Sequence, residues 1–351
     1  MGLKQPNPLK STFKLPSRAA AEGRGLASCG LVAIVVGGMG CAAAGQLRTL
    51  HDPLPVDDEV PFDRLHQKSV HNAYDRDEPI GEQLREHGFR SLELDIHPTK
   101  LGQPTLKDDW WVYHFGVPGF DGSSCASLGE CLGEVRAFHR EAPEHEVLTV
   151  FIDLKDSLES EGHRPGDLDA RVRRSLPAEA IVEPADLMRR CPAARSLREA
   201  VAGACSWPTV GELRGRIFIV LTGGDRCDPR SPVSRYAEAA SADGVAFVAP
   251  RVNDACSFQA QARSGDNVFF NLDAAAFRHA RAISRAHLVS RGFSGGLGGG
   301  IDDPSQWADA LESGVNILAT DQVDAARAPW TDALGVTPGG SRRAVASTVG
   351  R

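Results

Sequence analysis

The stretch Ser91-Leu92-Glu93-Leu94-Asp95-Ile96 decides the fold class of this chain. Its apolar residues alternate with a serine and two acids, which predicts a β-strand with one apolar face. Because side chains alternate along a strand, Glu93 and Asp95 lie on the same face. The apolar residues pack outward against helices, so the acids face the interior of a barrel. Buried carboxylates are costly unless they are paired or bind a metal, and the stretch therefore also indicates a functional site.

Strands and helices alternate around this stretch over about 260 residues, which favours a parallel α/β fold. The run Val147–Ile152 is continuously apolar, as in strands that are buried on both faces. Nine strands are predicted, at residues 65–70, 89–96, 110–115, 146–154, 216–221, 245–249, 268–272, 287–290 and 315–319. A closed (β/α)8 barrel needs eight strands, so we expect one of the two between residues 245 and 272 to be an extra element.

Periodicity alone leaves a second architecture open, a doubly wound parallel sheet. Neither a dinucleotide-binding fingerprint nor a P-loop follows the first strand, which excludes the commonest ligands of that fold. Helices are predicted at residues 79–87, 128–141, 274–285 and 304–313, with two or three more in the polar stretch that ends near Pro208.

Ionisable and polar side chains follow four consecutive predicted strands. They are His71 and Asn72, then Glu93 and Asp95, then His114, and finally Asp153 and Lys155. The carboxyl ends of parallel strands meet at one rim of a barrel, where active sites gather. Phosphodiester cleavage needs this combination, because imidazoles move protons and hard oxygen ligands hold a divalent cation that offsets the phosphate charge.

These motifs resemble those of the phosphatidylinositol-specific phospholipase C-like phosphodiesterases, and in particular their calcium-dependent bacterial branch. The matching segments are Ser69–Tyr74 (SVHNAY), Ser91–Asp95 (SLELD), Val112–His114 (VYH) and Asn316–Asp321 (NILATD). The resemblance extends over residues 63–325, and its specific motifs lie in the first third. It implies a TIM-type (β/α)8 barrel, regular or irregular, in a single domain.

The resemblance also implies roles for individual residues. His71 and His114 are then the catalytic residues, which do acid–base and transition-state work. Asn72, Glu93 and Asp95 are then ligands of a calcium ion, which is the expected cofactor.

The fourth strand departs partly from the family pattern. Calcium-dependent relatives tend to supply another carboxylate there, and the nearest acid in this chain is Asp153, with Lys155 two residues later. This pair resembles the acid-x-Lys of the glycerophosphodiester phosphodiesterases. Asp153 is interpreted as a further metal ligand and Lys155 as a cation near the substrate phosphate.

Further residues are predicted near the same rim. Asp321 is expected either to orient His71 or to cap a loop. Arg251 and Arg291 follow late strands and are candidates for contacts with phosphate or inositol. His97 is expected to have a supporting or structural role, because its strand ends there.

The leading hypothesis is an enzyme, an exported Ca2+-dependent phosphodiesterase that cleaves phosphatidylinositol to diacylglycerol and inositol (cyclic) phosphate. The inositol 2-hydroxyl attacks phosphorus, a base near the metal (His71 or a ligand carboxylate) takes its proton, and His114 protonates the leaving oxygen. Two alternatives are a phosphodiesterase acting on glycerophosphodiesters or sphingomyelin-like lipids and a non-catalytic secreted binding barrel. Asn72 after His71, where glycerophosphodiester enzymes tend to carry Arg, favours the inositol lipid.

The first 44 residues have the order basic, apolar and small that is typical of a secretory signal. The apolar stretch Leu26–Met39 is too short and too rich in glycine for a permanent membrane span. We therefore expect a secreted or periplasmic protein, and a lipoprotein anchored through Cys41 is the alternative. The predicted domains are a leader at residues 1–44, a linker at 45–62, the barrel at 63–330 and a disordered tail at 331–351.

Cysteine usage agrees with export. Outside the leader the chain has six cysteines, and an even number in an exported chain indicates disulfides. Six cysteines allow 15 pairings, of which the simplest joins nearest neighbours: Cys125–Cys131, Cys191–Cys205 and Cys227–Cys256. Buried free thiols are the alternative. The sequence has no Cys-x-x-Cys, so a zinc site or a redox dithiol has little support.

The formal net charge is −7. An acidic protein without a basic run lacks the electrostatic footprint of a nucleic-acid binder, and tight docking on an anionic membrane is equally unsupported. The expected partner is a phospholipid substrate at a membrane surface, and the sequence implies no protein partner.

Overall fold

The computed structural model describes residues 57–116, 122–203, 205–240, 244–261, 265–295, 299–324 and 328–332. All of them belong to one compact unit, Arg48–Arg351. The predicted secretion signal, most of the predicted linker and nearly all of the predicted tail lie outside the described residues.

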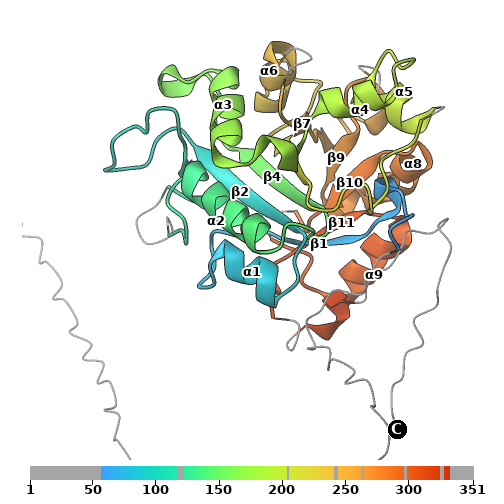
Figure 1. The fold of residues 1–351 in the computed structure, drawn as a ribbon, viewed down its shortest axis with the longest axis horizontal. Coiled ribbons are helices and arrows are strands. Elements are labelled where there is room, and N and C mark those ends of the chain that lie inside the picture. Colours follow the sequence, from blue (N-terminus) through green and yellow to red (C-terminus); the bar gives the residue numbers. More distant parts are fainter. Residues whose placement is uncertain are drawn as a thin grey trace, which may run out of the picture. The chain divides into compact units, whose positions relative to one another are not determined.

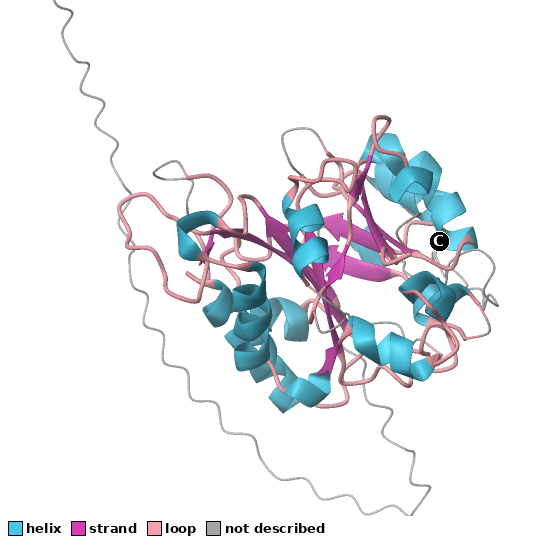
Figure 2. Ribbon diagram, turned by 90° about the horizontal axis from the view of Figure 1, so that it is seen from above, coloured by secondary structure: helices cyan, strands magenta, loops and turns pink. Residues whose placement is uncertain are grey.

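Parallel strands form the central sheet, which curls into a barrel (Figures 1 and 2). Strand β1 (Gln67–Val70) lies between β2 (Ser91–His97) and β11 (Ile317–Thr320) and pairs with both in parallel. Beyond β2 the sheet continues with β4 (Leu148–Leu154) and β6 (Ile217–Thr222). Beyond β11 it continues with β10 (Val289–Gly292) and β9 (Phe269–Leu272).

Residues 247–252 close the barrel between β6 and β9. Their first part, β7 (Phe247–Val248), pairs with β6, and their second part, β8 (Arg251–Val252), pairs with β9. Pro250 interrupts the strand between the two parts, because proline has no backbone N–H to donate. Its carbonyl still accepts a hydrogen bond from the backbone N–H of Asn271 at 3.0 Å. The fold is therefore a TIM-type (β/α)8 barrel with one interrupted strand, as predicted.

The prediction of which strand is extra was wrong. Residues 245–249 and 268–272 both contribute to the barrel, whereas the third predicted strand does not. This strand, β3 (Trp111–Val112), pairs antiparallel with the end of β2, with Ile96 opposite Val112. The connection from β2 contains no helix, and a parallel crossover normally needs one. His114 thus reaches the rim on a returning hairpin and not at the end of a parallel barrel strand.

A second short strand, β5 (Ile181–Val182), also lies outside the barrel order. It pairs with the first residues of β6, with Ile181 opposite Ile217, whereas β7 pairs with later residues of β6. One edge of β6 is thus shared between an accessory strand near its start and a barrel strand near its end.

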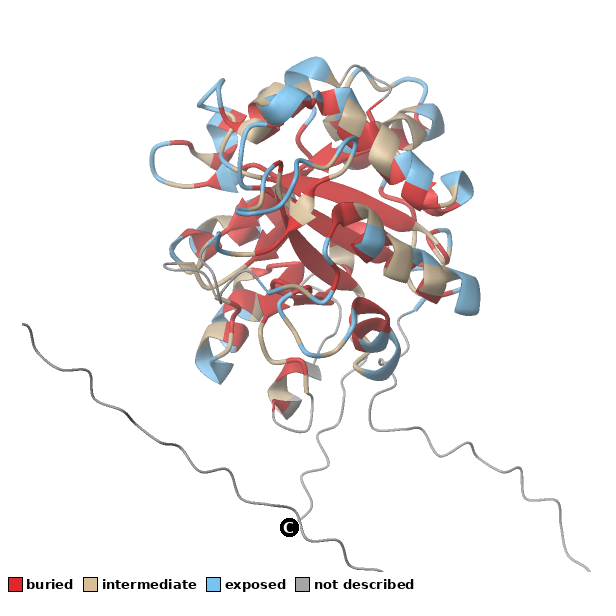
Figure 3. Ribbon diagram, turned by 90° about the vertical axis from the view of Figure 1, so that its left-hand side faces the viewer, coloured by how far each residue is buried: buried red, intermediate tan, exposed pale blue. Residues whose placement is uncertain are grey.

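Helices cover the outside of the barrel, and their exposed residues face away from the buried strands (Figures 1 and 3). Helices α2 (Leu128–Glu141) and α9 (Pro304–Ser313) have the predicted bounds. Side chains at their N-caps define where they begin: Ser127 accepts from the N–H of Glu130, and Asp303 accepts from those of the first turn of α9. The other α-helices are α1 (Ile80–Glu86), α3 (Pro165–Ser175), α4 (Pro184–Arg190), α5 (Leu197–Ala202), α6 (Pro232–Ala239), α7 (Phe258–Gln261) and α8 (Ala280–Arg285).

Aromatic side chains fill the amino-terminal part of the barrel interior. Phe62, just before β1, stacks on Phe218 of β6 with ring centroids 4.7 Å apart, and Trp207 packs edge-on against Phe269 of β9. Each buried aromatic of this kind contributes about 1.5–3 kcal/mol through the hydrophobic effect. Between these rings and the rim, the buried polar pair Gln67 and Thr149 is neutral and satisfied by its own 2.7 Å hydrogen bond, whereas the acids Glu93 and Asp95 lie nearer the carboxyl end of the strands.

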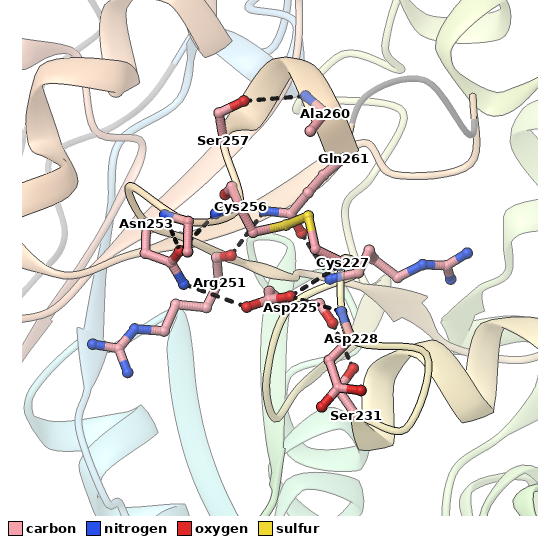
Figure 4. The surroundings of a disulfide bond; sticks show 12 residues. Asp225, Cys227, Asp228, Ser231, Arg251, Asn253, Cys256, Ser257, Ala260 and Gln261 are labelled. Atoms are coloured by element: carbon pink, nitrogen blue, oxygen red, sulfur yellow. Dashed lines mark hydrogen bonds between the residues drawn. A yellow bond between two sulfur atoms is a disulfide. The ribbon is translucent and has the colours of Figure 1, made fainter.

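Three disulfides join the nearest cysteines in the chain, as predicted: Cys125–Cys131, Cys191–Cys205 and Cys227–Cys256. The third links the loop after β6 to the loop after β8 at the rim (Figure 4). Asp225 accepts from the N–H of Cys227 at 2.9 Å, and Asn253 accepts from that of Cys256 at 2.8 Å. Among the described residues, no helix is long and apolar enough to cross a membrane.

Candidate active site

The register of β2 against β4 brings two acids side by side at the carboxyl end of the barrel. Asp95 lies directly opposite Asp153, and Glu93 lies opposite Phe151. Side chains of alternate residues face inward, so Glu93 occupies a deeper layer of the interior than Asp95 and Asp153. The predicted acids therefore converge on one face, as the alternation in the sequence implies.

His71 follows β1 and is anchored by an acid from the other end of the chain. Its Nδ1 lies 3.1 Å from Oδ1 of Asp321, and its Nε2 lies 3.7 Å from Oε2 of Glu93. Asp321 is itself held by Arg76 and by the backbone N–H of Gly300, which donates at 2.8 Å. Of the two predictions for Asp321, the structure is consistent with the one in which it orients His71.

The loop at Gly300 can hold Asp321 only because residue 300 has no side chain. A Cβ atom there would lie 2.3 Å from the backbone nitrogen of Asp321 and 2.4 Å from Cα of Thr320. Backbone this close cannot move aside cheaply, so glycine is required for the contact.

Opposing effects set the pKa values of His71 and Asp321. Burial lowers the pKa of His71, but the carboxylates of Glu93 and Asp321 outweigh it and raise the pKa above its ordinary value. Burial raises the pKa of Asp321, but hydrogen bonds from His71 and Gly300 and the charge of Arg76 hold it well below its usual range. The pair therefore favours a charged carboxylate beside a ring that takes up a proton readily.

His114 is anchored in the same way as His71. Its Nδ1 lies 2.9 Å from Oδ2 of Asp95 and 3.2 Å from Nδ2 of Asn72. Asn72 has a positive φ of 49°, a conformation that asparagine tolerates better than most residues, and this turns the chain sharply after β1. Both rings are thus held through Nδ1 by a carboxylate, and Nε2 lies on the opposite edge of each ring.

Asp95 is completely buried at the centre of these contacts. Burial raises its pKa, but hydrogen bonds from His114 and Lys155 and the charge of Lys155 outweigh burial, and the pKa falls below the ordinary value. Burial and the charges of Asp95 and Glu93 raise the pKa of the neighbouring Tyr74. Tyr74 therefore keeps its proton, and Asp95 is a carboxylate.

Glu93 forms a buried ion pair with Arg291 of β10. The Nη2 of Arg291 lies 2.6 Å from Oε2 of Glu93, and its Nη1 donates to Oδ1 of Asn271 at 3.1 Å. The guanidinium also lies over the ring of Phe151, 5.0 Å from its centroid. Arg291 is only 1% exposed, so this residue supports Glu93 from below and does not face a substrate as predicted from its position after a late strand.

Lys155 bridges the two acids of the upper layer. Its Nζ lies 2.6 Å from Oδ2 of Asp153 and 3.0 Å from Oδ2 of Asp95. Burial lowers the pKa of Lys155, but these two carboxylates outweigh it and raise the pKa above the ordinary value. The other oxygen of Asp153 accepts from the hydroxyl of Thr222 at 2.7 Å.

The donor set fits a calcium ion. Glu93, Asp95 and Asp153 each offer an oxygen, and these oxygens lie within 4.8 Å of one another. Two further oxygens, Oδ1 of Asn72 and Oδ1 of Asp95, are buried and have no hydrogen-bond partner among the described residues. Buried oxygens without donors are costly, and hard carboxylate and amide oxygens are the ligands that calcium prefers.

A second group, formed by Asp225, Cys227 and Cys256, also has its possible ligand atoms close together. Its two cysteines form a disulfide, so their sulfurs are not available as thiolate ligands (Figure 4). This group is therefore structural.

Two other predicted residues lie outside the acid cluster. Arg251 forms an ion pair with Asp273 at 2.7 Å on the rim. The ring of His97 lies 2.9 Å from Asp156 and stacks on Tyr113, as expected of a structural residue. Sequence reasoning missed Arg76, Thr222 and Tyr74 and did not foresee that Arg291 pairs with Glu93, because each of these contacts depends on how distant strands meet.

Comparison with solved structures supports the fold. The structure is similar to a calcium-dependent phosphoinositol-specific phospholipase C from Pseudomonas sp., with 23% identity, a TM-score of 0.66 and coverage of 79% of this chain and 95% of that one. It is also similar to a calcium-dependent phosphatidylinositol-specific phospholipase C from Streptomyces antibioticus, with 20% identity, a TM-score of 0.61 and coverage of 79% and 99%. At these identities the likeness shows the fold. A search among curated protein sequences finds no match.

Fold and family comparison together define a phosphoric diester hydrolase built on a (β/α)8 barrel. The sequence model described as "Phosphoinositide phospholipase C, Ca2+-dependent" matches residues 112–333, more than half of the 351 residues. The chain therefore belongs to the calcium-dependent phosphoinositide phospholipase C family. The match begins just before His114, so β1 and β2 lie outside it.

Proposed function

We propose that this protein cleaves phosphatidylinositol to diacylglycerol and an inositol phosphate, with calcium as cofactor and with His71 and His114 as catalytic residues. One observation carries the proposal: two histidines, each anchored through Nδ1 by a carboxylate, flank a cluster of three acids at the barrel rim. Proton transfer to and from a phosphodiester needs two such groups.

Asn72, Glu93, Asp95 and Asp153 would hold the calcium ion. They supply one amide and three carboxylates, and substrate oxygens and water would complete the six to eight ligands that calcium takes. When bound, the ion would supply positive charge that offsets the phosphate and lowers the pKa of a nearby hydroxyl. The unpartnered buried oxygens of Asn72 and Asp95 support this ligand set.

His71 is proposed as the base that receives the proton of the inositol 2-hydroxyl. Asp321 fixes its Nδ1, which directs Nε2 toward Glu93 and the acid cluster. The raised pKa of His71 makes the ring a stronger proton acceptor. Arg76 and Gly300 hold Asp321 and so keep the ring in one orientation.

His114 is proposed as the acid that gives a proton to the leaving glycerol oxygen. Its contact with Asp95, 2.9 Å from Nδ1 to Oδ2, holds the ring in one orientation and leaves Nε2 to face the substrate. Because Asp95 also contacts Lys155, the same carboxylate sets the position of the acid and of a cation proposed to meet the phosphate.

The lipid is proposed to approach the rim that carries His114. Phe115 lies beside this histidine, with ring centroids 3.9 Å apart, and is 51% exposed. Leu101, in the hairpin between β2 and β3, is also an exposed apolar side chain. Exposed apolar groups next to an active site suit contact with a lipid surface. We also propose export, which the three disulfides support.

The decisive experiment measures release of inositol phosphate from phosphatidylinositol vesicles, with calcium and with a chelator. Release is expected with calcium, and its loss is expected with chelator and in the variants His71→Ala and His114→Ala. His279→Ala is the matched control, because His279 lies in the 3-10 helix Ala274–His279 outside the site. Equal release with chelator would exclude the calcium mechanism, and release only from other diesters would exclude the inositol lipid.

A further inference from the structure

Lys155 is proposed to contact the substrate phosphate, yet in the structure its ammonium group is paired with acids of the same site. Its ammonium group is shared by Asp153 and Asp95, which are two of the three acids of the proposed calcium site. The side chain is 30% exposed, so the ammonium lies at the boundary between the acid cluster and the open rim.

Both oxygens of Asp153 already have a contact, and the one with Lys155 places a positive charge where a cation would bind. Its Oδ2 lies 2.6 Å from Lys155 and its Oδ1 accepts from Thr222 at 2.7 Å. The hydroxyl of Thr222 is neutral and tolerates a neighbouring ion, whereas the ammonium of Lys155 and a divalent cation repel each other. Lys155 and calcium therefore compete for Asp153.

Asp95 extends the same competition to the buried side of the cluster. Its Oδ2 is 3.0 Å from Lys155 and 2.9 Å from Nδ1 of His114. If Lys155 leaves, His114 still contacts this oxygen, so Asp95 stays in place. Its negative charge is then no longer offset by the ammonium. The acid cluster thus loses the cation at its rim and keeps its geometry, while Arg291 stays paired with Glu93 below it.

We propose that Lys155 is a built-in competitor for the calcium site, and that calcium binding displaces its ammonium from Asp153 and Asp95 toward the phosphate of the substrate. The inference rests on the proposed function and adds a regulatory step to it. Calcium then has a second effect, because it converts a lysine that is paired internally into one that can contact the substrate. An enzyme organised in this way engages the phosphate only after the ion has bound.

A competing arrangement predicts a different outcome. Asp95 has a second oxygen, Oδ1, that is buried and has no partner among the described residues. An ion held by this oxygen, Asn72 and Glu93 would leave Lys155 on Asp153. Calcium would then not change the environment of Lys155.

Chemical labelling of lysine distinguishes the two arrangements directly. The chain has four lysines between residues 57 and 332: Lys68, Lys100, Lys107 and Lys155. The full-length protein is treated briefly with an amine-acetylating reagent, with calcium or with chelator, and each lysine is quantified by mass spectrometry. Labelling of Lys155 is expected to rise at least about fivefold with calcium, while Lys107, which is exposed on the hairpin, stays constant.

Calcium affinity supplies a second measurement that does not depend on activity. Calorimetric titration of the Lys155→Met variant is expected to give a dissociation constant at least about fivefold lower than that of the original protein. Lys155→Arg keeps the charge and is expected to bind as the original does. Lys107→Met is the control for removal of one positive charge and is expected to change the constant by less than about twofold.

The results separate this inference from the proposed function. If the original protein binds calcium but Lys155 is labelled equally or more slowly with the ion, the competition is overturned while the calcium site stands. If Lys155→Met binds calcium as tightly as the original protein or more weakly, the competition is likewise overturned. If the original protein binds no calcium in either measurement, the proposed calcium site fails together with this inference.

Discussion

Replacing Arg291 by methionine tests the buried ion pair beneath the proposed site. Arg291 is 1% exposed and its Nη2 lies 2.6 Å from Oε2 of Glu93, whose side chain is 7% exposed, so water screens the pair very little. Removing one member of such a pair costs about 3–5 kcal/mol, because the other charge is left buried without a partner. The variant also leaves Oδ1 of Asn271 without the 3.1 Å hydrogen bond from Arg291.

Urea unfolding, followed by fluorescence in the presence of a chelator, measures this loss. The free energy of unfolding of Arg291→Met is expected to fall by about 3–5 kcal/mol. For a domain of this size, the melting temperature is expected to fall on the order of 10 °C. Adding Glu93→Gln to Arg291→Met is expected to restore part of the stability, because the second substitution removes the unpaired charge.

An exposed ion pair supplies the control. Arg190 of α4 lies 2.9 Å from Glu212, and both side chains are more than one third exposed. Arg190→Met is therefore expected to change the free energy of unfolding by less than about 1 kcal/mol. The reasoning is refuted if Arg291→Met costs no more than this control, or if the double variant is less stable than Arg291→Met.

Three further predictions concern catalysis, pH and the disulfides. His114→Ala is expected to lower turnover of phosphatidylinositol vesicles at least about a hundredfold, with the thermal unfolding curve kept, and an unchanged rate removes this residue from the mechanism. Burial lowers the pKa of His66 and of His145 to about 4. Unfolded chains take up these protons near pH 6.5, so the free energy of unfolding is expected to fall between pH 7 and pH 4, by about 3 kcal/mol for each histidine. Urea titrations across this range check it, and an equally steep loss in His145→Gln contradicts the assignment of His145. Replacing Cys227 and Cys256 by serine opens a loop of sequence separation 29 and is expected to lower the free energy of unfolding by about 3 kcal/mol. An unchanged urea midpoint under oxidising conditions contradicts this last expectation.

Local sequence patterns predicted most of the strands and several helix bounds. Alternation in Ser91–Ile96 identified both the strand and the face that carries Glu93 and Asp95, because strand geometry converts every second residue into one surface. Helices α2 and α9 were predicted to the residue, and the structure shows that Ser127 and Asp303 cap their first turns. The nearest-neighbour disulfides were predicted as the simplest of 15 pairings, and the structure confirms them.

Strand direction was not predictable from the same patterns. Trp111–Val112 has the composition of any short strand, and only its pairing with Ile96 and His97 shows that it is an antiparallel hairpin. Residues 245–249 were likewise predicted as a strand, but neither its continuation to residue 252 nor its role in closing the barrel was predicted. The composition of a strand depends mainly on how deeply the strand is buried. It depends little on whether the neighbouring strand is parallel or antiparallel.

The sequence by itself determined the order of the elements, the inward face of each long strand and the types of residue at the rim, because these depend on neighbours a few positions apart. The tertiary structure alone decided the partners of those residues. Arg291 meets Glu93 across 198 positions and Asn271 across 20, and of the two roles that the sequence left open for Asp321, the structure favours the contact with His71 across 250 positions. Such contacts exist only when the last strands close against the first, since closure brings charges into a dry interior where each must find an opposite partner.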